Sequence, residues 1–277
     1  MKSLMLKLLM IGLSSSFIFA NVTEDKLLRF LSKSVQATKS YQIKNISLTG
    51  SQNIKEIPGW KVYFIKIDLD LVGQNKSITI TDKIFTDGKL ISRDLFSMDS
   101  ARSIKHDFAP DFDKNFYDNE HIIAGNADAT NKLAIFSDPL CPFCISFMPK
   151  IIDFVNKYPQ QFVLYYYHFP LNIHPNSKTL IKASLAAKQQ GLRNVDKRVY
   201  KEAFHLNTKD DQLALNAFNK VMGTKFTLED INKKDILQRI EDDMKIVNAL
   251  GLNGTPRLFT NGKLDNSRTM YKKLLKK

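Results

Sequence analysis

Two cysteines, Cys141 and Cys144, are the residues whose type and spacing point most directly to chemistry. They are the only cysteines among the 277 residues of the chain. An apolar run at 133–136 precedes the pair, and apolar residues at helical spacing follow it over 147–155. This pattern predicts a strand, a tight turn and then a helix that begins at Cys141.

The predicted helix start gives the first cysteine a chemical advantage. Unpaired N–H groups and the helix dipole stabilise negative charge there, so the Cys141 thiol should ionise more readily than a free thiol. The thiolate is the form that attacks disulfides. Cys144 lies one turn further along, where it can close a disulfide with Cys141 or resolve a mixed one. The pair therefore predicts a dithiol–disulfide redox site with Cys141 as the nucleophile.

Two alternatives explain the cysteine pair less well. A purely structural disulfide across so short a loop stabilises little, because the gain grows with loop length. A structural zinc site needs four ligands, and the sequence contains no second cysteine pair. We therefore expect no metal at this site.

The composition is that of an ordinary globular protein with a basic surface. Hydrophobic residues make up 43% of the chain and charged residues 25%, and the length suggests about two domains. The formal net charge is +13, but the basic residues are scattered among acidic ones without a nucleic-acid-binding motif. We expect no nucleic-acid partner, although a basic surface attracts acidic ones.

Residues 1–20 are typical of an export signal. Lys2 and Lys7 form a basic start, a short apolar stretch follows, and Ala20 is a small residue at the expected cleavage point. The apolar stretch is shorter than the roughly 20 residues of a membrane-spanning helix, so an uncleaved anchor is the weaker alternative. Both interpretations place the rest of the chain outside the cytoplasm, in an oxidising compartment where disulfide exchange is useful.

Residues 21–104 predict a small α+β domain without a catalytic constellation. A helix is expected over 22–38, with Thr23 as its cap. Alternating apolar residues and an Asp-Gly pair predict strands and a hairpin turn. These signals lie at 65–71, 78–81 and 87–88. One helix should pack on an antiparallel sheet, in a domain that serves dimerisation or substrate binding.

Residues 105–130 are polar and charged, and they predict a partly helical linker. His106 and His121 lie in this stretch, and we expect both to be solvated or satisfied by near neighbours. Residues 131–277 then predict an α/β domain that opens with the strand before the cysteines.

The rest of that domain follows from its periodicity. The apolar run from Gln161 to Phe169 is typical of a strand buried on both faces. Helices are expected after it, at about 176–190, 196–205, 210–222 and 228–250. A strand at 257–260, a turn at 261–262 and a last helix from about 267 complete the pattern.

Several of these features together resemble the thioredoxin superfamily. They are Cys-Pro-Phe-Cys after an apolar strand, Pro149 five residues past the second cysteine, and Thr255-Pro256 before a C-terminal hairpin. The run at 136–144 is similar to the DsbC/DsbG branch of periplasmic disulfide interchange proteins, and the DsbG form is the closer match. The order of signal, small domain, linker and catalytic domain with a helical insertion fits that branch too. The stretch at 167–171 looks more like the DsbA-type oxidases.

The resemblance assigns roles to residues around the cysteines. It implies that Pro256 follows a cis peptide bond, faces the cysteines and shapes the edge where a substrate strand pairs. Thr255 would then border the nucleophile and tune it by hydrogen bonding. Pro142 and Phe143, between the cysteines, would help to set the redox properties. The strongest oxidases of the family have His where Phe143 stands, so we expect a milder oxidant than DsbA.

Two further positions bear on proton handling. Asp138, three residues before Cys141, matches the DsbC/DsbG pattern, and we expect it to shape the turn first and to relay protons second. Many thioredoxins bury an acid six residues before the nucleophile. Ile135 occupies that position here, so water or another group must handle the proton.

The resemblance implies a homodimeric periplasmic thiol:disulfide oxidoreductase without metal or organic cofactor. Its partners would be unfolded or misoxidised exported proteins, together with a membrane redox protein that resets the cysteine pair. Isomerase or reductase activity is favoured over a DsbA-like oxidase, and repair of sulfenic acids is a variant of the same chemistry. An alternative of another class is a periplasmic holdase chaperone that uses the N-terminal domain to hold unfolded clients.

Overall fold

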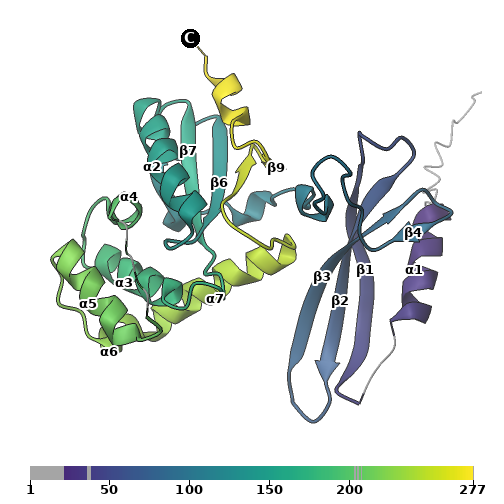
Figure 1. The fold of residues 1–277 in the computed structure, drawn as a ribbon, viewed down its shortest axis with the longest axis horizontal. Helices are drawn as coiled ribbons and strands as arrows, with labels where there is room; N and C mark the ends of the chain where they lie inside the picture. The colour runs from purple at the N-terminus through teal and green to yellow at the C-terminus, as the bar shows by residue number, and fades with distance from the viewer. Residues whose placement is uncertain (1–21, 36–38, 203, 205, 207, 277) are drawn as a thin grey trace, which may run out of the picture.

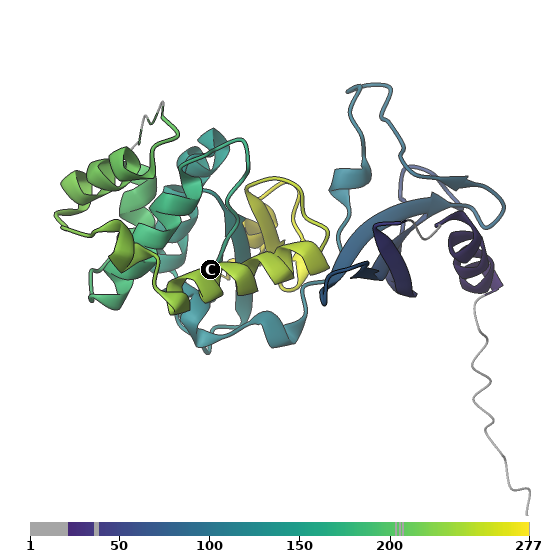
Figure 2. The same cartoon turned by 90° about the horizontal axis from the view of Figure 1, so that it is seen from below.

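The computed structural model describes residues 22–35, 39–202, 204, 206 and 208–276. The export signal predicted at 1–20 lies outside this part of the chain. The described residues form an N-terminal α+β unit and a larger α/β unit, which lie next to each other along the long axis of the molecule (Figures 1 and 2). No helix in the described part of the chain has the length and hydropathy that a membrane span requires.

The N-terminal unit is a helix packed on a four-stranded antiparallel sheet, as predicted. Its elements are α1 (Val22–Ser34), β1 (Tyr41–Asn53), β2 (Lys61–Leu71), β3 (Ser77–Thr86) and β4 (Ile91–Ser92), with the strands in chain order across the sheet. Leu27 and Leu31 of α1 pack against Tyr63 and Ile65 on one face. Helix α1 begins at Val22, so Thr23 lies in its first turn rather than at its cap.

Strand β1 was not predicted, and its position in the sheet explains why. It is an edge strand, and none of its residues is buried. Its apolar alternation is short and changes phase, since Tyr41 and Ile43 are followed by Ile46 and Leu48 across a register shift. The opposite face of the sheet carries Val62, Phe64 and Phe85, which are covered by Trp60 and by residues of the segment that follows β4.

The α/β unit contains a five-stranded sheet in the order β5-β7-β6-β8-β9. The strands are β5 (Ile122–Gly125), β6 (Asn131–Ser137), β7 (Phe162–His168), β8 (Arg257–Thr260) and β9 (Lys263–Leu264). Strands β6 and β7 are parallel, and the other pairs are antiparallel. Strand β5 lies inside the linker predicted at 105–130, so the linker is shorter than predicted. Three apolar residues in a polar stretch gave too weak a strand signal.

The helices follow the predicted order with different ends. They are α2 (Pro142–Lys157), α3 (Ser177–Gln189), α4 (Val195–Lys201), α5 (Asp211–Met222), α6 (Leu228–Ile231) and α7 (Lys234–Ala249). Short 3-10 helices are η1 (Lys105–Asp107), η2 (Lys114–Phe116), η3 (Asn119–His121) and η4 (Met270–Leu274). The last helix predicted from about 267 is therefore only η4.

The single helix predicted at 228–250 is two helices, α6 and α7. The capping box of Thr227 and Asp230 is present, but it begins the short helix α6. The break falls at Asn232 and Lys233, where Lys233 has an extended backbone. The Asn232 side chain donates to Leu228 O at 2.7 Å and accepts from Lys182 Nζ at 2.8 Å. These side-chain hydrogen bonds compete with continued helix, which is typical of Asn.

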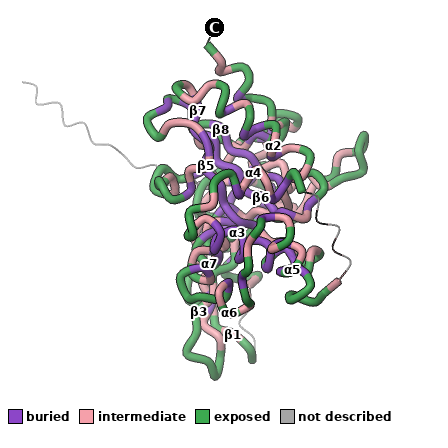
Figure 3. The backbone as a smooth tube through the Cα atoms, turned by 90° about the vertical axis from the view of Figure 1, so that its left-hand side faces the viewer, coloured by how far each residue is buried: buried purple, intermediate pink, exposed green. Residues whose placement is uncertain are grey.

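Both faces of the five-stranded sheet are covered, so β7 is buried along its whole length, as predicted. Leu164 and Tyr166 face the core shared with α2 and the helical insertion. Tyr165 and Tyr167 face the core shared with α7 and the linker. Figure 3 shows the central strands as the buried middle of the molecule.

Helix α7 connects this core to the N-terminal unit, and it runs from the insertion toward β3 (Figures 1 and 2). Lys83 of β3 is buried, and its Nζ donates to Gly251 O at 3.1 Å and to Lys105 O at 3.3 Å. Thr81 Oγ1 donates to Asn248 O. Burial lowers the pKa of Lys83 to about 8. The two units thus meet at the C-terminal end of α7.

Two glycines share the same backbone φ angle but differ in their surroundings, so substituting each by alanine tests how closely β5 packs. Gly125 and Gly191 both have φ +82°, but a Cβ at Gly125 would lie 2.1 Å from Phe162 O, whereas a Cβ at Gly191 would meet nothing within 4 Å. Gly191→Ala should lower the free energy of unfolding by about 1–2 kcal/mol from backbone strain alone. Gly125→Ala adds steric overlap and should cost about 4 kcal/mol or more. Denaturant unfolding measures both, and equal losses would contradict the close packing of β5.

Candidate active site

The helix that carries the cysteines begins where the sequence predicted. Cys141 is the N-cap residue of α2 with an extended backbone, and Pro142 occupies the first helical position. Proline suits that position because the helix does not need its missing N–H there. Residues at helical spacing anchor the inner face of α2, and they are Cys144, Met148, Ile151, Ile152 and Val155. Strand and helix together fix the position of both sulfurs.

The two cysteines are free thiols with unequal access to solvent. Cys141 retains 4% of its surface exposed, and Cys144 is fully buried. Phe143 between them is 71% exposed, so its ring contributes surface rather than core. The outer thiol is therefore the one that a second molecule can reach.

The Thr255–Pro256 segment lies directly beside Cys141. Strand β8 pairs with β6, with Arg257 opposite Phe136, and this pairing brings the preceding residues next to the cysteine turn. The Thr255–Pro256 peptide bond is cis, as the resemblance implied. In its protonated form, Cys141 Sγ donates to Thr255 O at 3.4 Å. The Thr255 hydroxyl is buried beside both sulfurs and has no other hydrogen-bond partner among the described residues.

The environment separates the acidities of the two thiols. The pKa of Cys141 is lowered to about 5, and a hydrogen bond from the Cys144 side chain is the largest cause. Burial acts in the opposite direction. Hydrogen bonds from Thr255 and from the N–H groups of Phe143 and Cys144 lower the pKa further. Burial raises the pKa of Cys144 far above its usual range. At neutral pH the pair is thus a thiolate at Cys141 and a thiol at Cys144. The neighbouring thiol stabilises the thiolate in addition to the helix start, which was the only source that the sequence argument included.

Asp138 is a buried carboxylate that shapes the loop before Cys141. It accepts hydrogen bonds from Leu140 N and Leu171 N, both at 2.7 Å, and from His174 Nδ1 at 3.0 Å. The turn-shaping interpretation therefore has a geometric basis. Its carboxylate oxygens bond to this loop and to residues 171–174, and its backbone N–H is the group that bonds to the Cys144 sulfur.

Ile135 and two histidines of the α/β unit are buried. Ile135 is buried in the core. His168 is buried and bonds to Asp243 at 2.6 Å through Nδ1. His121 is buried as well, between Asp118 and Asp243, so it is not solvated; Asp118, three residues before it, is a near neighbour of the kind expected. Its second partner comes from α7, 122 residues along the chain, which no local pattern reveals.

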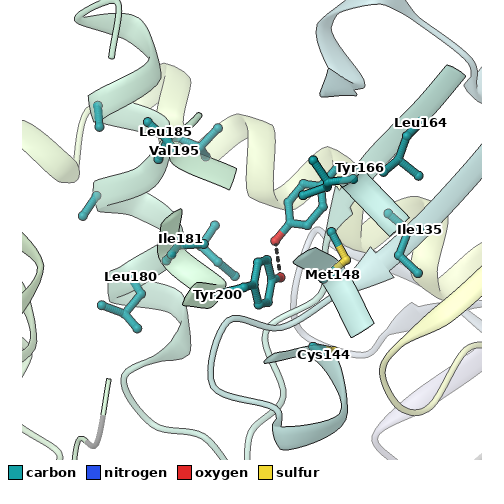
Figure 4. Close-up of a cluster of buried hydrophobic side chains, with 14 of the residues drawn as sticks. Ile135, Cys144, Met148, Leu164, Tyr166, Leu180, Ile181, Leu185, Val195 and Tyr200 are labelled. Atoms are coloured by element: carbon teal, nitrogen blue, oxygen red, sulfur yellow. Dashed lines mark hydrogen bonds between the residues drawn. The ribbon is translucent and has the colours of Figure 1, made fainter. Parts of the chain in front are cut away.

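Sequence reasoning missed a set of hydroxyl groups beneath Cys144. The Ser137 side chain hydrogen-bonds the Cys144 sulfur. Tyr200 Oη donates to Ser137 Oγ at 2.7 Å, and Tyr166 Oη lies 2.8 Å from Tyr200 Oη. Figure 4 shows the two tyrosines pointing toward each other, with Tyr200 on the side of Cys144. Ser137 ends β6 and Tyr166 lies two residues before the end of β7, but Tyr200 comes from the helical insertion, whose placement the sequence does not indicate.

A pocket of about 330 Å³ lies next to the cysteine loop. Leu140, Ile173, Phe204 and Leu206 are among the residues that line it. In the described part of the chain, no three His, Cys, Asp or Glu side chains come together in an arrangement suited to a metal ion. The site as a whole suits attack of a Cys141 thiolate on a disulfide, followed by attack of Cys144 on the mixed disulfide.

Comparison with known proteins gives one family match and several partial likenesses. Residues 118–276 match the family model described as Thioredoxin. The Na(+)/H(+) antiporter NhaA 1 of Mycolicibacterium gilvum is 31% identical over 150 residues, which are 51% of this chain and 23% of that protein. The chain thus spans about a quarter of the length of the curated relatives that it matches.

Two solved structures illustrate the structural likenesses. The thiol-disulfide exchange protein alpha-DsbA2 from Wolbachia pipientis has a TM-score of 0.44 at 21% identity, covering 57% of this chain and 87% of that one. Oxidised BdbD from Bacillus subtilis has a TM-score of 0.46 at 16% identity, covering 60% of this chain and 98% of that one.

The acidity of Cys141 makes a direct prediction. Alkylation of the reduced protein by iodoacetamide should slow as the pH falls through about 5, because protonation removes the thiolate. Cys144→Ala removes the largest stabilising hydrogen bond, so the midpoint should rise by roughly one to two pH units. Phe143→Ala keeps the backbone N–H and serves as the control with an unchanged midpoint. A wild-type midpoint near that of a free thiol, about 8.5, would contradict this assignment.

Proposed function

Because the chain belongs to the thioredoxin family, as its match over residues 118–276 shows, we propose that it is a thiol:disulfide oxidoreductase that uses Cys141 and Cys144. The fold that supports this proposal is a thioredoxin-like α/β fold with a helical insertion, next to an N-terminal helix on an antiparallel sheet. The observation that carries the proposal is the pair of free thiols at the start of α2, Cys141 at the N-cap and Cys144 buried behind it, beside the cis Thr255–Pro256 bond.

The reaction proceeds in two exchange steps. The Cys141 thiolate attacks one sulfur of a client disulfide, forms a mixed disulfide and expels the other client sulfur as a thiolate. Cys144 then attacks Cys141 Sγ, and its proton passes to the departing client sulfur. The client sulfur expelled in the first step takes a proton from water, so the client leaves with two thiols. The cysteine pair ends as a disulfide, so two electrons have moved from the protein to the client. If a client thiol resolves the mixed disulfide instead, the outcome is isomerisation.

We propose that the protein acts mainly as an isomerase or reductase, and that a membrane redox partner keeps the cysteine pair reduced. The motif resemblance to the DsbC/DsbG branch supports this direction. Phe143 supports it as well, because the strongest oxidases of the family have His at that position.

The second candidate is a dithiol oxidase, and the same thiolate favours it. A stabilised thiolate stabilises the reduced form, which makes the disulfide form a stronger oxidant. In this direction a client thiolate attacks Cys141 of the disulfide, Cys144 leaves as a thiolate, and a second client thiolate attacks the mixed disulfide. The client gains the disulfide and the protein returns to the dithiol form.

Clients and location are part of the proposal. The signal-like residues 1–20 support a periplasmic location, where unfolded or misoxidised exported proteins would be the clients. The pocket beside Leu140 offers apolar surface to a client chain. The N-terminal unit would provide dimerisation, and the unpaired outer edge of β1 in the described sheet is a surface available for it. A monomer in light scattering would contradict the dimer.

The redox state in cells tests the direction of the reaction. Thiol alkylation of freshly quenched cells should find the Cys141–Cys144 pair mostly as a dithiol if the protein is an isomerase or reductase. A pair that is mostly disulfide would instead establish the oxidase direction. Cys144→Ala, which cannot form the internal disulfide, provides the single-thiol reference.

Substitution of each cysteine tests whether redox chemistry is the function at all. Cys141→Ala should reduce isomerisation of a scrambled disulfide substrate to the uncatalysed rate, because the attacking thiolate is gone. Cys144→Ala should keep the first step and accumulate mixed disulfides with clients, visible on non-reducing gels. If Cys141→Ala retains full activity in protecting clients, the holdase alternative replaces the redox proposal.

A further inference from the structure

The hydroxyl groups beneath Cys144 form a continuous chain inside the protein. Ser137, Tyr166 and Tyr200 are all buried. The O···O distances are 2.7 Å between Tyr200 and Ser137 and 2.8 Å between Tyr166 and Tyr200. The chain begins in β7, passes through α4 of the insertion and ends at the last residue of β6, next to the Cys144 sulfur.

The hydrogen bonds of this chain run in one direction. Each hydroxyl has a single proton to donate. Tyr200 donates its proton to Ser137 Oγ, so in the 2.8 Å contact the donor must be Tyr166. The Ser137 oxygen already accepts from Tyr200, which leaves the Ser137 proton for the Cys144 sulfur. Every donor in the chain therefore points toward that sulfur.

We propose that the chain of Tyr166, Tyr200 and Ser137 stabilises negative charge on the buried Cys144 sulfur, and that these three residues are positioning residues for the exchange step in which Cys144 takes part. The inference rests on the proposed function, because only thiol–disulfide exchange places a charge on that sulfur. When Cys144 attacks Cys141 Sγ, charge builds on Cys144 as its proton moves to the departing sulfur. In the opposite direction Cys144 leaves as a thiolate.

Burial makes such donors necessary. A charged sulfur removed from water is costly unless hydrogen bonds compensate for the lost hydration. Besides Cys141 and Thr255, the groups that bond to the Cys144 sulfur are the Asp138 N–H and the Ser137 hydroxyl. In none of these four contacts is the bonding group a carboxylate or an imidazole. Ile135, two residues before Ser137 on the same strand, is apolar.

The two tyrosines are suited to remain donors. Burial raises their pKa values well above the usual range, so both stay protonated. Neutral donors in series polarise one another, and the effect is strongest in a low-dielectric interior. Ser137 contacts the sulfur directly, so it should contribute most, followed by Tyr200 and then Tyr166.

A two-phase reaction with the disulfide reagent DTNB tests the proposal on the full-length reduced protein. Cys141 attacks the reagent and releases one thionitrobenzoate; Cys144 then attacks the mixed disulfide and releases the second. Cys144→Ala, which stops after the first release, identifies the second phase. Ser137→Ala should slow the second phase about tenfold, the effect of losing one hydrogen bond to a charged group, and Tyr200→Phe should slow it by a smaller factor. Their first phase should keep its wild-type rate.

The chain offers a matched control. Tyr63 is also buried, in the N-terminal unit, and its hydroxyl has no hydrogen-bond partner among the described residues. Tyr63→Phe should leave both phases unchanged. Tyr166→Phe should slow the second phase by a smaller factor than Tyr200→Phe, since Tyr166 acts through Tyr200.

The outcomes separate this inference from the function on which it rests. If the wild-type protein releases no second thionitrobenzoate, the proposed function itself fails. The positioning role is overturned if the wild-type protein shows two phases and Tyr200→Phe keeps the wild-type rate of the second phase. The thermal unfolding midpoint of Tyr200→Phe should be unchanged in that comparison. Tyr200→Phe removes a single oxygen, so it decides the question even if Ser137→Ala fails to fold.

Discussion

The hydrogen bond between the two thiols is the interaction on which the site depends. It stabilises the Cys141 thiolate more than any other contact, and it requires Cys144 to remain protonated. Burial of Cys144 in the core keeps it so. The helix start brings the sulfurs together, but the difference between them comes from depth: Cys141 keeps 4% of its surface exposed, and Cys144 keeps none.

The rest of the fold maintains this difference in depth. The pairing of β8 with β6 positions Thr255 next to the outer sulfur. The insertion covers the inner sulfur and contributes Tyr200, which reaches Ser137. Asp138 bonds the cysteine loop to the segment at 171–174, where the insertion begins. The insertion is thus part of the redox site as well as an addition to the sheet.

The features predicted correctly from the sequence are those that show as a pattern among neighbouring residues. Strand β6, the start of α2 at Cys141 and the fully buried β7 follow from apolar periodicity and position. The cis bond before Pro256 came only from the resemblance. Strand β1 and strand β5 were missed, because an exposed edge strand and a four-residue strand give weak patterns. Tyr200 could not be placed, since contacts between residues 63 positions apart depend on how the insertion packs.

The contact between the two units constrains one side of the redox site. Lys83 and Thr81 of the N-terminal sheet bond to the carbonyls of Gly251 and Asn248, and Thr255 follows four residues after Gly251. Three residues therefore separate Gly251, which the N-terminal unit holds in place, from Thr255, whose carbonyl faces Cys141. So short a connection has little slack, and a rotation of the N-terminal unit would be transmitted mechanically to the rim around the reactive sulfur.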